Sequence, residues 1–280
     1  MEETVIRRGF VDGPFGQVHY REAGAGSGRP ALVLLHQTAD SGAMYADAMR
    51  ALAPRLHVIA PDTPGFGASA APAAAPGLAG YVDALLAFAD ALGLARAHWL
   101  GHHSGAGFAL ELAARHPRRV DRLVLCGVPR VAPNECAARI EALSPPRACT
   151  GADAIDWAWR RIVQRMGGWA TEAQMRTSFL DTLGALGWIR PAYEAVYACD
   201  ASARAAQVQA PTLLLCGEAD GFAASQQALL PRFARGQLHL LAGVGASALL
   251  QAPAAFSAAV ATFLGGGATT FLRDPGDTTP

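Results

Sequence analysis

Residues 101–105 bring several chemically active side chains into one short stretch. Two imidazoles, His102 and His103, and one hydroxyl, Ser104, lie between two glycines. An imidazole accepts and donates protons near neutral pH, and a hydroxyl becomes a nucleophile when a base activates it. The sequence therefore predicts proton transfer or nucleophilic attack at this point of the chain.

The flanking segments would hold these side chains at the apex of a sharp turn. Residues 97–100 are an apolar run typical of a buried strand, and residues 108–115 repeat apolar positions at helical spacing. Glycines are needed where such a strand enters a helix, because a side chain would clash with the neighbouring strand and helix. The helix N-terminus presents unpaired N–H groups that favour negative charge. We expect His103 to project from this turn.

The spacing fits the G-x-S-x-G turn that presents a nucleophile, with one difference. Gly101 and Gly105 occupy the glycine positions, but His103 stands between them, and Ser104 comes one position late. A displaced nucleophile at Ser104 and a purely structural His103 both stay open as alternatives.

Composition favours a globular protein that acts on a small molecule. The 280 residues are 51% hydrophobic and 16% charged, which suits one large domain with an inserted subdomain. Net charge is zero and basic runs are absent, which argues against nucleic-acid binding. No apolar run approaches the ~18 residues of a membrane span. The sequence does not decide the oligomeric state, and a homodimer is one option.

Cysteine usage and the N-terminus predict a cytoplasmic protein. Five cysteines are scattered without the paired spacing of metal ligands, and residues 1–3 are charged rather than part of an apolar signal segment. Reduced thiols are typical of the cytoplasm.

The order of predicted elements is that of a doubly wound parallel α/β sheet. A hairpin over residues 9–23 precedes strands at 31–35, 56–60, 97–100, 119–125, 211–217 and 237–241, with helices at 45–53, 81–92, 108–115, 224–234 and 253–264. The alternation stops over residues 131–209, which are helical in character and hold four of the five tryptophans. We expect a core of residues 1–130 and 210–265, a helical cap at 131–209 and a flexible tail at 266–280. Ligands of such sheets bind at the carboxyl ends of the strands.

Further segments carry a family resemblance. They are residues 34–36, residues 62–69, the turn at 101–105, residues 217–220, and residues 243–245 followed by 251–253. In this order the chain resembles the α/β-hydrolase-fold superfamily of the kind with a helical cap, over roughly residues 9–265. The resemblance implies a mostly parallel twisted sheet flanked by helices.

The resemblance also implies a catalytic triad, of which two members are missing. His103 stands at the nucleophile position and Ala246 at the position of the general-base histidine, whereas Asp220 keeps the acid position. The only histidine after residue 116 is His239, in the middle of a predicted strand. A Ser-His-Asp relay therefore has neither nucleophile nor base.

We hypothesise that His103 turns into the space at Ala246 and hydrogen-bonds Asp220. The carboxylate would fix the tautomer of a general base, which contributes roughly 10²–10⁴-fold to a rate. The base would activate water or remove a proton next to a carbonyl. The resemblance implies that the backbone N–H groups of Ser104 and Gln37 hold the oxyanion.

The neighbours of this pair have open roles. His36 would brace the oxyanion loop or touch substrate, and His102 would be structural. The amide of Gln37, where the family usually has glycine, would donate to a substrate oxygen or tie down its own loop. A metal site of His36, His102 and His103 is not favoured, because adjacent histidines at a sharp turn should point apart. No metal or cofactor is expected.

Other polar and aromatic residues have mainly structural interpretations. Asp62 would stabilise the turn before Pro64, and Asp200 would cap a helix or form a salt bridge. Of the cap aromatics, one or two would line the cavity and favour an apolar, aromatic substrate; these are Trp157, Trp159, Trp169, Trp188 and Tyr193.

The leading function is a cofactor-independent hydrolase that acts on a small, largely apolar carbonyl compound through His103 and Asp220. One alternative is a lyase, isomerase or cyclase that uses the same base without water. The other is a ligand-binding pseudoenzyme that keeps the cavity and has lost the chemistry.

Overall fold

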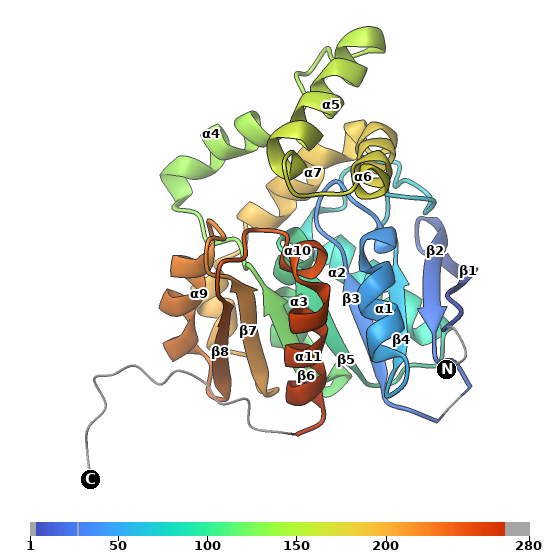
Figure 1. Cartoon of the computed structure of the whole chain (residues 1–280), viewed down its shortest axis with the longest axis vertical. Coiled ribbons are helices and arrows are strands. Elements are labelled where there is room, and N and C mark those ends of the chain that lie inside the picture. The colour runs from blue at the N-terminus through green and yellow to red at the C-terminus, as the bar shows by residue number, and fades with distance from the viewer. Residues whose placement is uncertain (1–3, 27, 267–280) are drawn as a thin grey trace.

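The computed structural model describes residues 4–26 and 28–266. They form one eight-stranded sheet in the order β1-β2-β4-β3-β5-β6-β7-β8 (Figure 1). Strands β3 to β8 are parallel, whereas β1 pairs antiparallel with β2, and β2 antiparallel with β4. The strands are β1 (Arg7–Gly13), β2 (Gly16–Ala23), β3 (Ala31–Leu35), β4 (His57–Pro61), β5 (Ala97–His102), β6 (Val120–Cys126), β7 (Thr212–Gly217) and β8 (Gly236–Leu241).

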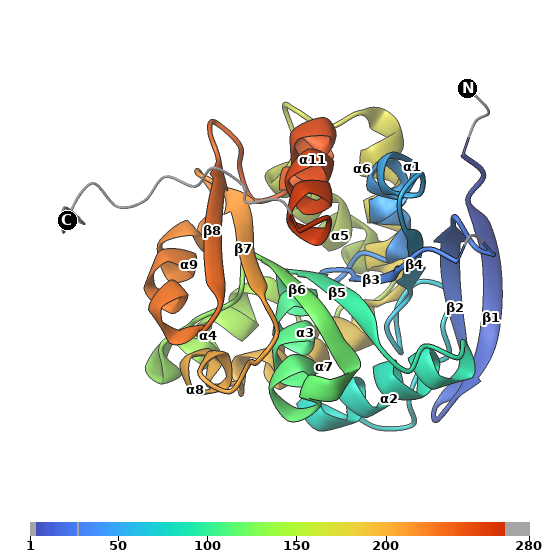
Figure 2. The ribbon, with the colours of Figure 1, turned by 90° about the horizontal axis from the view of Figure 1, so that it is seen from below.

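Helices cover both faces of this sheet, as seen from below in Figure 2. One layer holds α1 (Ala46–Leu52), α10 (Ala248–Gln251) and α11 (Pro253–Leu264), and the other holds α2 (Gly77–Ala91), α3 (Ser104–Arg115) and α9 (Ala223–Leu229). Leu32 and Leu34 of β3 pack in the core with α1 and α11, whereas Val33 and Leu35 pack with α2 and α3. Burial on both faces explains why the parallel strands are unbroken apolar runs.

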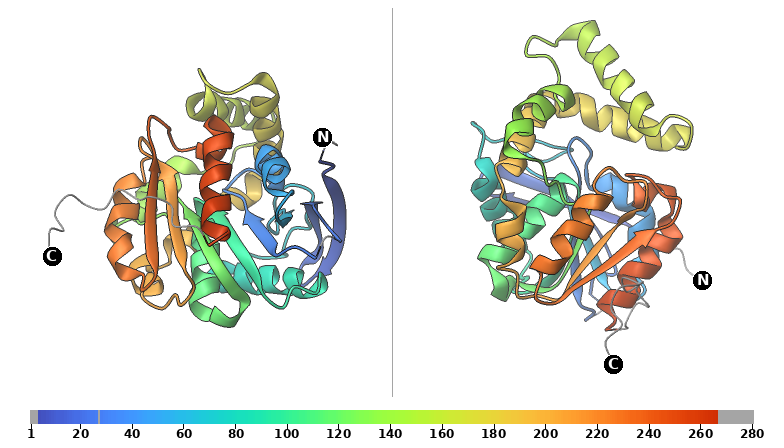
Figure 3. Two further views of the ribbon diagram at one scale, coloured as in Figure 1. Left: turned by 60° about the horizontal axis from the view of Figure 1, so that its bottom comes forward. Right: turned by 90° about the vertical axis from the view of Figure 1, so that its left-hand side faces the viewer.

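Five helices lie between β6 and β7 and are called the helical insertion below. They are α4 (Pro133–Leu143), α5 (Gly151–Met166), α6 (Glu172–Gly184), α7 (Leu186–Tyr197) and α8 (Ala201–Ala205). Figures 1 and 3 show α4, α5 and α6 beyond the carboxyl ends of the parallel strands. The core residues of α7 pack in the same cluster as those of α2 and α3. The insertion therefore covers the edge of the sheet where ligands bind in this architecture.

The element boundaries differ most from the sequence-based expectations at three helices. Helix α3 begins at Ser104 rather than at residue 108. Helix α2 begins at Gly77 rather than at residue 81, because Gly77 and Gly80 hide the helical pattern of its first turn. Helix α9 ends at Leu229, and a 3₁₀ turn, Leu230–Arg232, replaces the last part of the expected helix. Proline lies inside that turn, where it removes a backbone donor. The expected tail at 266–280 lies outside the described residues except for Gly266.

Two further 3₁₀ turns, Gly42–Tyr45 and Pro117–Arg119, complete the described helical elements. Within residues 4–26 and 28–266, every helix is too short or too polar to cross a bilayer.

Candidate active site

His103 occupies the apex of the turn between β5 and α3. Its φ of 48° and ψ of −111° are a rare combination for a residue with a side chain, and its N–H donates to Cys126 O at 2.7 Å. A Cβ at Gly101 would overlap the backbone of Gly105, and one at Gly105 would overlap the carbonyl of Leu35. The two glycines are therefore required by close backbone approach, as the sequence predicts.

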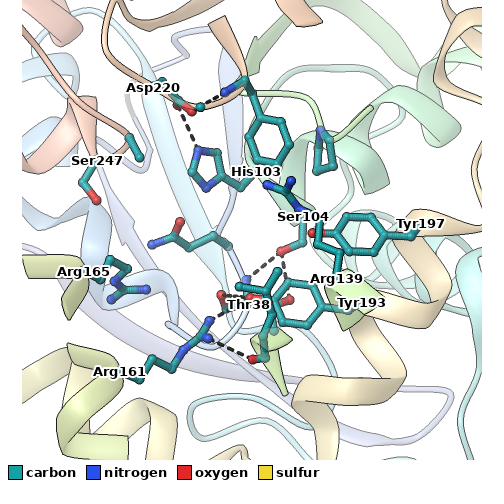
Figure 4. A pocket seen from close by; sticks show the side chains of 16 residues that line it. Thr38, His103, Ser104, Arg139, Arg161, Arg165, Tyr193, Tyr197, Asp220 and Ser247 are labelled. Carbon is teal, nitrogen blue, oxygen red and sulfur yellow. Dashed lines mark hydrogen bonds and ion pairs between the residues drawn. The ribbon is translucent and has the colours of Figure 1, made fainter. Parts of the chain in front are cut away.

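The imidazole of His103 is hydrogen-bonded to the carboxylate of Asp220. Nε2 of His103 lies 3.0 Å from Oδ2 of Asp220 (Figure 4). The Asp220 side chain is 2% exposed and the His103 side chain 19% exposed. The backbone N–H of Phe222 donates to Oδ1 of Asp220 at 2.9 Å. Because an ionised carboxylate only accepts, Nε2 donates in this contact, and in a neutral imidazole the lone pair then lies on Nδ1.

Two rings hold the His103 imidazole in place. The Phe222 ring meets it edge-on at a centroid distance of 5.3 Å. The His102 ring lies 4.2 Å away at an angle of 31°, so the expectation that these adjacent histidines point apart is wrong. Burial, followed by the neighbouring His103 and Arg165, lowers the pKa of His102 well below its ordinary value. His102 is therefore a neutral structural residue, and it hydrogen-bonds the backbone of Ala246.

The hydroxyl of Ser104 is hydrogen-bonded to Thr38 rather than to His103. Its Oγ accepts from the Thr38 N–H at 2.6 Å and from the Thr38 hydroxyl at 2.9 Å. The backbone N–H groups of Ser104 and Gln37 have no acceptor among the described residues. Ser104 is the first residue of α3, so its N–H belongs to the positive end of the helix dipole.

His36 and Gln37 both stabilise the loop after β3. Burial lowers the pKa of His36, and its neutral ring donates from Nδ1 to Gln37 O at 2.9 Å and accepts the Thr63 N–H at Nε2, also at 2.9 Å. Both ring nitrogens are thus engaged, and His36 is not part of the cavity lining. The Gln37 amide donates to Asp40 at 2.6 Å, although its side chain reaches the cavity. This contact ties the Gln37 amide to its own loop.

No cluster of three or more histidine, cysteine or acidic side chains has the arrangement of a metal site within the described part of the chain. All five cysteines are free thiols. Two acids have the structural roles expected of them. Asp62 accepts the Ala68 N–H at 2.9 Å in the turn after β4, and Asp200 caps α8 by accepting the Ser202 N–H at 3.0 Å.

A cavity of about 220 Å³ opens between the turn at His103 and the helical insertion. Figure 4 shows its side chains. None of the four tryptophans of the insertion lines it, whereas Tyr193 does, together with a second tyrosine that the sequence reasoning did not single out. The lining comprises Gln37, Thr38, His103, Ser104, Pro129, Arg139, Leu143, Arg161, Arg165, Tyr193, Tyr197, Asp220, Gly221, Phe222, Ala246 and Ser247.

Three arginines of the insertion line the cavity, and the sequence reasoning missed them. Arg139 comes from α4, and Arg161 and Arg165 come from α5. Arg161 and Arg165 are four residues apart and therefore share one face of their helix. This spacing could have indicated that the two side chains lie on the same side of the helix. The expectation of a largely apolar substrate does not account for these charges.

Comparisons with known proteins agree with the fold. Residues 30–148 match the family model described as alpha/beta hydrolase fold. RutD of Caulobacter sp. (strain K31), named as a candidate carbamate hydrolase, is 38% identical over 121 residues, which cover 43% of this chain and 44% of RutD. The 2-hydroxymuconate semialdehyde hydrolase of Pseudomonas sp. (strain CF600) is 41% identical over 107 residues, 37% of this chain and 38% of that protein. The matches span less than half the length of these relatives.

The structural likeness extends over nearly the whole chain. A hydrolase from Pseudomonas aeruginosa PA01 superposes with a TM-score of 0.79 at 26% sequence identity, covering 92% of this chain and 98% of the other. The family model over residues 30–148 and the structural likeness over nearly the whole chain both show that this chain has the alpha/beta-hydrolase fold.

Proposed function

We propose that the protein is a cofactor-independent hydrolase of small carbonyl compounds in which His103, oriented by Asp220, activates a water molecule. The observation that carries this proposal is the 3.0 Å contact between Nε2 and Oδ2, made by an imidazole that is partly exposed to the cavity. Relatives named as hydrolases support the class of reaction by analogy.

The proposed reaction uses the second nitrogen of His103. With Nε2–H donated to Asp220, a water molecule hydrogen-bonded to Nδ1 loses its proton as its oxygen attacks the carbonyl carbon. In this proposal the free backbone N–H groups of Ser104 and Gln37 hold the oxyanion. The protonated imidazole then returns its proton to the leaving group. General base catalysis of this kind contributes roughly 10²–10⁴-fold.

Water attacks directly in this proposal, and no covalent acyl-enzyme forms. The nucleophile position holds His103, and the nearest hydroxyl, on Ser104, accepts two hydrogen bonds from Thr38. A serine nucleophile needs an adjacent base that removes its proton, and no hydrogen bond connects Ser104 Oγ with His103 in the described part of the chain.

The helical insertion has the position of a cap. We propose that residues 131–209 form a unit over the site, whereas residues 1–130 and 210–265 form the core that carries the catalytic pair. Such a cover excludes bulk water and strengthens the electrostatic interactions within the cavity.

Substitution of the pair tests this function. His103→Ala and Asp220→Asn should each lower kcat by about 10²-fold or more in a panel of esters, lactones and ketones. The matched control is His57→Gln, because His57 also pairs with a carboxylate, Glu22, at 2.8 Å but lies outside the cavity. Equal loss in His57→Gln and His103→Ala would contradict the proposal.

The fate of oxygen separates hydrolysis from the alternatives. Turnover in labelled water should place one labelled oxygen in the product. Turnover that depends on His103 but leaves the label in the solvent would instead indicate a lyase, isomerase or cyclase. Binding without turnover would indicate a pseudoenzyme. Covalent labelling of Ser104 by a fluorophosphonate would show that the hydroxyl is the nucleophile and that the proposal is wrong.

A further inference from the structure

We propose that the substrate is a small organic anion, a carboxylate-bearing carbonyl compound, and that Arg161 binds its carboxylate while Arg139 guides it into the cavity. This inference rests on the proposed function and names the class of substrate for the same site. It replaces the apolar compound that the aromatic residues of the insertion suggest.

Arg161 is a fixed guanidinium with a charge that no carboxylate compensates among the described residues. Its Nη1 donates to Leu143 O at 2.9 Å and its Nη2 to the Tyr193 hydroxyl at 2.7 Å. The rings of Trp157 and Tyr193 flank it at 5.6 and 6.0 Å. Its buried Nε–H has no acceptor. Such a group is pre-organised, and its uncompensated charge favours an anion.

Arg139 lies at the exposed rim of the same cavity. Its guanidinium stacks on the Phe222 ring at 5.0 Å and is hydrogen-bonded to Tyr197. Phe222 in turn contacts the His103 imidazole, so one aromatic ring separates Arg139 from the proposed base. Arg139 forms no ion pair within residues 4–26 and 28–266. A charge at a rim mainly accelerates the approach of an oppositely charged ligand.

The third arginine of the lining, Arg165, differs because a carboxylate compensates its charge. Arg165 donates to Oδ1 of the buried Asp40 at 2.9 Å. Asp220 is the one acidic residue among those that line the cavity, and its carboxylate is hydrogen-bonded to His103. Two guanidinium groups therefore face the cavity without a negative partner, which favours an anionic ligand. A guanidinium matches the two oxygens of a carboxylate in a bidentate pair.

The other lining residues limit the size and polarity of the rest of the substrate. Leu143, Phe222 and Tyr197 add apolar surface to the lining, and the cavity holds about 220 Å³. The substrate is therefore a short carboxylic acid that also carries an ester or lactone carbonyl, and a short keto acid resembles it but offers no leaving group. Figure 4 shows Arg161 on the side of the cavity away from Asp220, so the carboxylate and the reacting carbonyl would occupy opposite ends.

Calorimetric binding to the full chain tests this assignment. The probes are short straight-chain keto acids and the uncharged amide of each one. We expect at least one acid to bind about tenfold or more tightly than its amide. Arg161→Gln should remove most of that preference, and Arg139→Gln should weaken binding less, with the loss disappearing at high salt.

Arg160→Gln is the matched control. Arg160 is the neighbour of Arg161 on α5, and its side chain is 79% exposed and paired with Asp156. This variant should bind like the wild type. Arg161→Lys keeps the charge but loses the paired N–H donors of the guanidinium, so it should bind at an intermediate strength. It replaces Arg161→Gln as the test if that variant fails to fold. Equal binding of every acid and its amide to the wild type would overturn the proposal, as would equal losses in Arg160→Gln and Arg161→Gln.

The His103→Ala variant separates this inference from the proposed function. It should keep most of its preference for the keto acids over their amides, because Arg161 is held by Leu143 and Tyr193 rather than by the imidazole. Acid-selective binding together with unchanged turnover in His103→Ala would refute the general base and leave the anion site standing. Loss of turnover in His103→Ala without acid-selective binding would refute the anion site alone.

Discussion

The backbone of Gly127, directly after β6, lies against the imidazole of His103. A Cβ at Gly127 would lie 2.7 Å from Nε2 of His103 and 3.0 Å from Oδ2 of Asp220. Its φ of +64° is also one that residues with side chains rarely adopt. The hydrogen bond of the pair therefore depends on a position that has room only for glycine.

Gly127→Ala should separate the His103–Asp220 pair. The added methyl group meets both partners, so the imidazole must move, and a displacement of about 1 Å at a catalytic group can lower a rate about 10²-fold. We expect kcat for the best substrate of the panel to fall by that order. Steady-state kinetics measures the loss, and a thermal melt measures the accompanying strain of about 1–2 kcal/mol.

Gly93→Ala is the control for backbone strain. Gly93 has a φ of +70°, and an added Cβ there meets no atom within 4 Å. This variant should lose stability like Gly127→Ala and keep its turnover. The prediction is wrong if both variants retain full activity, because crowding at His103 would then have no consequence.

The double variant His103→Ser with Ala246→His should regain the chemistry of a serine triad. Asp220 already occupies the acid position, and Ala246 lines the cavity next to it. A hydroxyl at the apex and an imidazole between it and the carboxylate complete the relay. We expect covalent labelling by a fluorophosphonate, measured by intact-protein mass spectrometry. His103→Ser alone lacks a base, and labelling of that single variant at the same rate would contradict the prediction.

Arg165→Gln should destabilise the protein through Asp40. Burial acts to raise the pKa of Asp40, but Arg165, followed by hydrogen bonds from Gln37 and Ser178, holds that pKa below its ordinary value. Removing the guanidinium leaves a buried carboxylate unpaired, which costs about 3–5 kcal/mol. Because the freed carboxyl then favours its protonated form, the loss should be larger at pH 7.5 than at pH 5. Urea unfolding at both pH values measures this difference.

Asp40→Asn added to Arg165→Gln should recover much of the lost stability, because the unpaired charge is gone. Arg160→Gln breaks an exposed pair with Asp156 and should change the free energy of unfolding by less than ~1 kcal/mol. A loss in Arg165→Gln as small as this would show that the buried pair contributes little.

The sheet and the turn at His103 could be predicted because local sequence determines them. Buried parallel strands such as β3 are continuous apolar runs, and Gly101 and Gly105 mark a backbone approach that no side chain permits. The contact between His103 and Asp220 could also be inferred, because the resemblance places both at one edge of the sheet and Ala246 leaves room between them.

The cationic lining of the cavity could not be predicted in the same way. Arg161 and Arg165 share a helix face with Trp157, but which face of α5 turns toward the sheet depends on packing between distant elements. The close, tilted contact between the His102 and His103 rings could not be predicted either. The unusual backbone angles at His103 set the orientation of its ring, and these angles cannot be inferred from the spacing of residues in the sequence.

Asp181→Asn should stabilise the protein at neutral pH and have little effect in acid. Burial raises the pKa of Asp181 to about 6, the Ser41 hydroxyl that donates to it at 2.7 Å opposes the rise, and the nearby Asp40 and Asp62 add to it. A folded-state pKa above the unfolded value means that the folded protein binds the proton more tightly, so stability is lost as pH rises from about 4 through about 6. Asparagine removes this loss and still accepts from Ser41, which should gain about 2 kcal/mol at pH 7.5. Urea unfolding at pH 4.5 and 7.5 measures the gain, with the exposed Asp83→Asn on α2 as control. A gain of equal size at both pH values would show that Asp181 does not titrate in this range.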